Sequence, residues 1–228
     1  MDKDKKIARS VGLLFVITMI LGMIDAYTIS PVLNTPLNNI SSNEVRVIIG
    51  ALCILLMSVG VVFIAILLYP ILERYNKIIA ITYLSFRVME CLLLITGVIV
   101  YLLLIILSHE YVNEGSPSAS YYQTIGALAI EARYSAYQVA MFILSIASLM
   151  LCYLFYQTKL IPRFITIVGI IGYALVLLSV PLDILDIIDT TEDGGMMYVP
   201  GAIFELILLP IWLIVKGFDS STVVFESS

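Results

Sequence analysis

The chain alternates between long apolar stretches and short polar connections. Six stretches have about the 20 residues that an α-helix needs to cross roughly 30 Å of hydrocarbon. Each stretch is continuous, without the in-and-out alternation of a membrane β-barrel. The pattern therefore predicts an all-α fold, an integral membrane bundle of six transmembrane helices. The predicted spans are 9–30, 47–70, 78–107, 124–156, 163–183 and 199–216.

The third and fourth spans are longer than one crossing, so we expect them to tilt or to extend beyond the bilayer. The connections are too short for a soluble domain, which predicts one transmembrane domain over residues 1–218 and a short cytoplasmic tail at 219–228. The first span begins with basic residues, as a signal peptide does. Asp25 lies near the end of this span and five further spans follow it, so we expect the first span to be retained.

Composition supports the membrane class. Of the 228 residues, 61% are hydrophobic and 13% charged, whereas about a quarter of a typical soluble domain is charged. There is no basic block, so we expect the lipid bilayer and no nucleic acid as partner; protein partners, including a second copy of the chain, stay open. Cys53, Cys91 and Cys152 lie in apolar runs and are expected to act as small hydrophobic residues.

Basic residues set the expected orientation, because loops on the cytoplasmic side are enriched in Lys and Arg. Six spans place nine of the twelve Lys and Arg residues on the side of the termini and leave the opposite side acidic. We therefore expect a cell-membrane protein with both termini in the cytoplasm. The nine residues are Lys3, Lys5, Lys6, Arg9, Arg74, Lys77, Lys159, Arg163 and Lys216.

Several short signatures occur in a familiar order. They are Lys5–Arg9, Phe86–Glu90, Ile161–Arg163, Pro200–Leu206 and Trp212–Phe218. Together they resemble the prokaryotic membrane proteins of the domain of unknown function 4386 family, over nearly the whole chain. The resemblance implies six spans and no established activity. Residues 131–135 depart from the family, where His and Gly are common, so no role is carried over to that segment.

Three charged residues fall inside apolar runs. Arg87 and Glu90 are three residues apart and so share a helix face, and each charge costs roughly 2.5–3.5 kcal/mol at the centre of a span. Glu205 is expected at a similar depth in the sixth span. Their summed charge of about −1 predicts that one carboxyl holds a proton or recruits a cation, unless Arg133 reaches the group. Both a structural ion pair and an ion or proton site remain open.

A run of acids follows the fifth span on the opposite side from the termini. Asp183, Asp186, Asp189 and Glu192 recur every third residue, which predicts an amphipathic helix that continues past Pro181. The spacing does not match an EF-hand loop. A solvated outer acidic patch and weak cation gathering are the two interpretations.

No motif of a hydrolase, phosphate-binding loop or metal site occurs, so we expect no enzyme activity, no cofactor and no metal. The sequence favours a structural or regulatory membrane component with a buried polar cluster. The alternative is a small proton- or cation-coupled transporter or channel-like protein. A cavity that reaches Glu90 or Glu205 favours transport, whereas a fully packed cluster favours the structural role.

Overall fold

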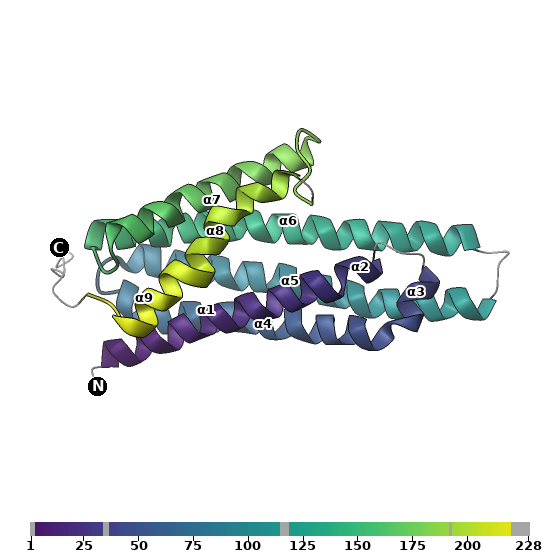
Figure 1. The fold of residues 1–228 in the computed structure, drawn as a ribbon, viewed down its shortest axis with the longest axis horizontal. Helices are drawn as coiled ribbons and strands as arrows, with labels where there is room; N and C mark the ends of the chain where they lie inside the picture. Colours follow the sequence, from purple (N-terminus) through teal and green to yellow (C-terminus); the bar gives the residue numbers. More distant parts are fainter. Residues whose placement is uncertain (1–2, 34–36, 115–118, 192, 220–228) are drawn as a thin grey trace.

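The computed structural model describes residues 3–33, 37–114, 119–191 and 193–219. Within these ranges there is no strand, and six helices are long and apolar enough to cross a membrane (Figure 1). The predicted all-α, six-span fold is therefore confirmed. The first five spans contain α1 (Lys3–Thr28), α4 (Glu44–Leu72), α5 (Lys77–Glu114), α6 (Ala119–Thr158) and α7 (Arg163–Ile184).

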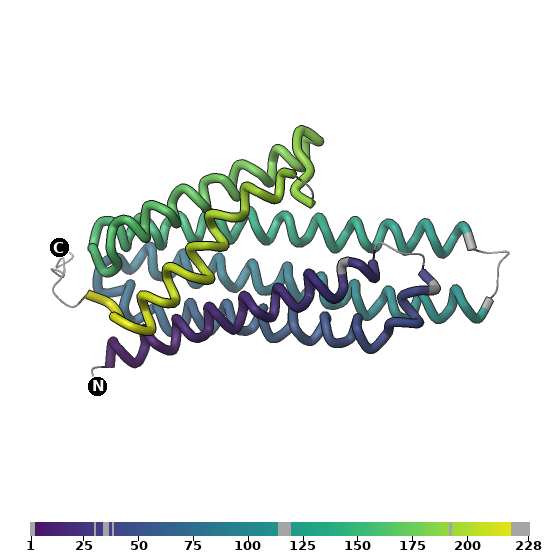
Figure 2. Tube along the Cα trace, in the orientation of Figure 1, coloured from purple at the N-terminus to yellow at the C-terminus, as the bar shows by residue number. Residues whose placement is uncertain are grey.

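The sixth span is a series of helical pieces that follow one another along the bundle (Figure 2). They are the 3₁₀ helix η2 (Asp193–Tyr198), α8 (Val199–Ile203), the π-helical turn η3 (Phe204–Leu208) and α9 (Leu209–Val215). The Leu209 N–H donates to the Phe204 carbonyl, five residues back instead of four. Pro210 accounts for the change, because its ring removes an N–H and clashes with the carbonyl four residues earlier. The wider turn contains Glu205.

Two helices are much longer than a membrane is thick. α5 has 38 residues and α6 has 40, which correspond to roughly 57 and 60 Å at 1.5 Å per residue. Figure 1 shows them reaching past the other helices at the end of the bundle far from the start of α1. The expectation that the third and fourth spans exceed a single crossing agrees with these lengths.

The connection after α1 contains two short helices, α2 (Ser30–Leu33) and α3 (Leu37–Ser42). Their apolar residues lie in a buried cluster with Val98 and Leu104 of α5, and Ile40 is fully buried. The Ser108 hydroxyl also donates to the Leu37 carbonyl at 2.5 Å. This connection therefore packs against the bundle as a folded cap.

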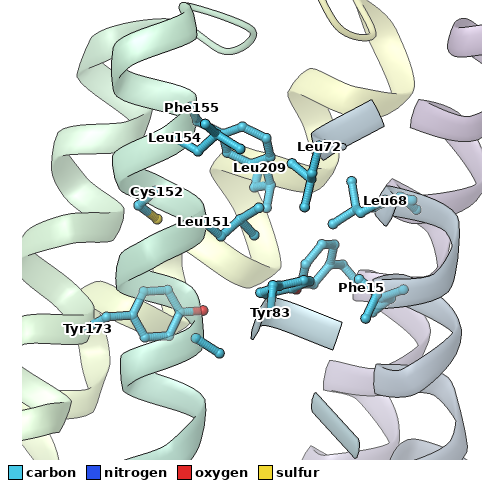
Figure 3. Packing of buried hydrophobic residues seen from close by; sticks show 14 of the residues in the cluster. Phe15, Leu68, Leu72, Tyr83, Leu151, Cys152, Leu154, Phe155, Tyr173 and Leu209 are labelled. Atoms are coloured by element: carbon cyan, nitrogen blue, oxygen red, sulfur yellow. The ribbon is translucent and has the colours of Figure 1, made fainter. Parts of the chain in front are cut away.

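α1 begins and α9 ends at the same end of the bundle (Figure 1). The two helices are joined there, since Arg9 Nε donates to the Ile214 carbonyl at 3.2 Å. An apolar core fills this end and draws on α1, α4, α5, α6 and α9 (Figure 3). In lipid, close packing is what favours such contacts, because the tails outside are as apolar as the core. The labelled residues that Figure 3 shows in this core include Phe15, Leu68, Leu72, Leu151, Phe155 and Leu209.

Glycines bring α7 and α8 into direct backbone contact. A Cβ added to Gly172 would lie 2.5 Å from the Gly201 nitrogen and 2.7 Å from its Cα. Gly169 is similarly tight, with the Phe204 ring 2.8 Å from an added Cβ. Small residues permit such close crossings between membrane helices, and they fix α7 beside the turn that contains Glu205.

Candidate functional site

The Arg87 side chain on α5 is the centre of a buried polar cluster. Its Nη1 donates to Glu90 Oε2 at 2.9 Å, and its Nη2 donates to Glu205 Oε1 at 3.3 Å. Its Nε donates to the Tyr83 hydroxyl at 3.1 Å. The structure thus brings together all three residues that the sequence singled out.

Helix geometry explains the α5 part of this cluster. Tyr83, Arg87 and Glu90 are spaced by four and three residues, so their side chains share one face. The Arg87 and Glu90 side chains are each 2% exposed, whereas that of Glu205 is 14% exposed. Glu205 has both the longer contact with Arg87 and the greater exposure, so it is the more accessible of the two acids.

The Tyr173 hydroxyl on α7 lies near Glu205 but has no well-formed hydrogen bond to any described group. Tyr173 is only 3% exposed, and its ring meets the Phe204 ring edge-on at 5.9 Å. Figure 3 shows this tyrosine pointing from α7 towards the centre of the bundle. A buried hydroxyl without a well-formed hydrogen bond is costly, so this group can contact a ligand that enters beside Glu205.

A second ion pair lies further from the termini. Arg133 Nη2 on α6 donates to Asp25 Oδ2 on α1 at 3.2 Å, and the Tyr101 hydroxyl donates to Asp25 Oδ1 at 2.8 Å. The Arg133 guanidinium also stacks over the Tyr101 ring at 4.6 Å. The expectation that Arg133 could complete the Arg87 cluster was wrong, because Asp25 binds it. An acid inside the first apolar run was the sequence signal for this pair, and its partner could not be identified from spacing.

The outer acidic patch divides into different environments. α7 continues past Pro181 but ends at Ile184, so the predicted amphipathic helix stops three residues beyond the proline. Asp183 is part of a polar group, in which it accepts hydrogen bonds from Tyr134, Gln138 and the Thr190 backbone. Asp186 and Asp189 are exposed, and Glu192 lies outside the described residues. The solvated patch stays a prediction for the exposed Asp186 and Asp189, whereas the partners of Asp183 lie 45 or more residues earlier on α6 and seven residues later.

A cavity of about 590 Å³ connects the two ion pairs. It reaches Arg87, Glu90 and Glu205 at one level and Asp25 and Arg133 at another. Its remaining walls are largely aliphatic and methionine side chains from α1, α4, α5 and α6. Near the α7–η2 connection the lining becomes polar again, with Tyr134, Thr190 and Tyr198.

Metal ligands do not gather in the described part of the chain, where no group of three or more His, Cys, Asp or Glu side chains could hold an ion. Cys53, Cys91 and Cys152 are free and buried. His109, the single histidine, lies 3.2 Å from Glu44, and both side chains are exposed. The chemistry of the site therefore rests on carboxylates, guanidinium groups and tyrosine hydroxyls.

Fold and cavity together define a multi-pass helical membrane protein with an internal charged site. The chain belongs to the family described as a domain of unknown function (DUF4386), whose model matches residues 10–217. This match confirms the family resemblance seen in the short signatures. No curated protein and no solved structure matches the chain.

Proposed function

We propose that this protein is a small proton- or cation-coupled transporter and that the cavity is its substrate site. The observation that carries the proposal is that the cavity reaches Arg87, Glu90 and Glu205. A purely structural ion pair gains nothing from empty space beside it, since buried charges are most stable when fully paired. Cavities of 300–1,000 Å³ with a few convergent polar groups are typical ligand sites.

The charge balance of the cluster supports coupling to an ion. Arg87 is shared between two carboxylates, so one negative charge has no full counter-charge. Charged residues inside the membrane commonly belong to ion or proton pathways. A carboxylate that binds either a proton or another cation provides the exchange step that a coupled transporter needs.

Proteoliposomes containing the full-length protein and a pH-sensitive dye test the proposal. We expect a gradient of the transported solute, or of Na⁺ or K⁺, to move protons faster than in protein-free liposomes. The panel of solutes should include amines, amino acids and sugars. The Glu205→Gln variant should lose this movement. Glu131→Gln, the same chemical change at an exposed position of α6, should retain it.

Proton movement at the protein-free rate for every gradient, across a range of pH, contradicts the proposal. It would favour the second candidate, a structural or regulatory membrane component. That role is supported by the Arg87 guanidinium, because each of its three nitrogens donates a hydrogen bond to a side chain of the bundle itself. In that case Glu205→Gln should change thermal stability and nothing else.

A further inference from the structure

We infer that the cavity binds a monovalent organic cation with an apolar body, and that the cation competes with a proton for Glu205. The inference rests on the proposed function only in that both use the same cavity. It names the chemical class of the ligand, which the transport proposal leaves open.

The sign of the ligand's charge follows from the charged side chains that face the cavity. Its lining has three carboxylates and two guanidinium groups. Asp25 is matched by Arg133 and by the Tyr101 hydroxyl, which leaves Glu90 and Glu205 to share Arg87. A cation entering beside Glu205 balances the excess charge. An anion would have to displace Glu205 from Arg87 and would leave a carboxylate unpaired in a low-dielectric site.

The apolar body of the ligand follows from the walls. The cavity is lined by four methionines, Met19, Met23, Met57 and Met141. Most of the other apolar lining residues are aliphatic. Methionine side chains adapt to varied apolar shapes. A small inorganic ion needs several oxygen ligands in place of its water shell, and here the carboxylates are already held by arginines. A ligand that brings its own apolar surface suits these walls better.

Tyrosines complete the site for a cation. Tyr173 and Tyr137 both line the cavity, and the negative faces of tyrosine rings attract cations. The Tyr173 hydroxyl has no well-formed partner within the described residues and lies near Glu205. This buried oxygen can accept a hydrogen bond from an ammonium group, or its ring can contact a quaternary one.

Competition with protons is expected because Glu205 is the carboxylate that lacks a full counter-charge. In the described part of the chain, the titratable and charged groups around Glu205 are Arg87, Glu90 and Tyr83 on α5, Cys152 on α6 and Tyr173 on α7. Among them only Arg87 carries a positive charge, and Glu90 is closer to it. A proton and an organic cation therefore satisfy the same need, and binding of one weakens binding of the other by linkage.

Two ions of the same shape and opposite charge test the inference. Binding of labelled tetraphenylphosphonium and tetraphenylborate is measured by equilibrium dialysis against the full-length protein in nanodiscs, with empty nanodiscs as background. We expect saturable binding of the phosphonium, weaker as pH falls, and no saturable binding of the borate. This comparison needs no variant, so it stands even if substitutions impair folding.

Variants then test whether Glu205 provides the negative charge that binds the cation. Glu205→Gln should weaken phosphonium binding at least tenfold, while Glu205→Asp should keep part of it and Glu131→Gln all of it. Thermal unfolding and gel filtration verify that each variant is folded. Equal binding of both ions, no saturable phosphonium binding, or unchanged affinity in folded Glu205→Gln each overturns the inference.

The results that would overturn the transport proposal differ from those that would overturn the organic cation as ligand. Proton flux driven by another solute, without saturable phosphonium binding, overturns the organic cation and leaves transport standing. Phosphonium binding that depends on Glu205, without any flux in proteoliposomes, supports the ligand class and overturns transport.

Discussion

Asp25 and Arg133 are 108 residues apart in the chain, and their side chains form an ion pair of 3.2 Å between α1 and α6. This pair and the Arg87 cluster face the same cavity. The Asp25 pair is balanced, with one acid and one base, whereas the Arg87 cluster has two acids for one base. The two levels of the cavity therefore differ in charge balance.

Replacing Arg133 by Leu should destabilise the protein by about 1–3 kcal/mol, because it leaves the Asp25 carboxylate buried without its base. The expected loss is below that of a fully buried pair, since the Arg133 side chain is 21% exposed. The double variant Asp25→Asn with Arg133→Leu should recover part of the loss. Thermal unfolding in one detergent compares the three proteins, and a double variant less stable than Arg133→Leu would contradict the pairing.

Arg87→Leu should be more damaging, by about 3–5 kcal/mol, because two acids then remain buried without a base. Adding Glu90→Gln should recover only part of this loss, since Glu205 also contacts Arg87. The triple variant with Glu205→Gln should recover more. Expression level and melting temperature rank the series, and full recovery in the double variant would show that Glu205 is not coupled to Arg87.

The crossing of α7 and α8 predicts unequal effects at its two glycines. Gly172→Ala should destabilise by about 1–3 kcal/mol through overpacking, because the new methyl group meets the Gly201 backbone at 2.5 Å. Gly201→Ala is the matched control, since its added Cβ meets nothing closer than Val176 Cγ2 at 3.7 Å. Equal melting temperatures for the two variants would contradict the direct backbone contact at this crossing.

Orientation can be tested by cysteine labelling in intact cells with a reagent that does not cross the membrane. α1 begins and α9 ends at one end of the bundle, and the basic residues predict that this end is cytoplasmic. Lys5→Cys should stay unlabelled until the cells are opened, whereas Glu110→Cys should react from outside. The native cysteines are buried, which keeps the background low. The opposite pattern would invert the topology.

The six spans could be predicted because each apolar run is long enough to require a membrane, whatever the tertiary arrangement. The Arg87 cluster could be predicted in part, since Arg87 and Glu90 share a face of one helix and an isolated charge in a span needs a partner. Pro210 was visible in the sequence and is the physical cause of the π-helical turn at Glu205, but the way the chain accommodates it depends on packing.

The Asp25–Arg133 pair could not be derived in the same way. Its members lie on helices whose contact is set by the whole bundle, and the sequence suggested Arg133 only as an addition to the group of Arg87, Glu90 and Glu205. Asp183 shows the same limit, since its spacing with Asp186 and Asp189 suggested a solvated helix face while its hydrogen-bond partners include Gln138 on another span. The cavity is a property of the packed helices together and has no local sequence signal.

The great length of α5 has a consequence for the surrounding lipid. Its exposed apolar side chains extend from Ile78 to Val112, about 51 Å along the helix axis, whereas those of α7 extend from Phe164 to Ile184, about 30 Å. The lipid-facing surface of α7 therefore matches an ordinary bilayer, whereas that of α5 is taller. Lipid must thicken or α5 must tilt, each at a fraction of a kcal/mol per ångström. A change of acyl-chain length should therefore affect the lipid contacts of α5 and α7 unequally.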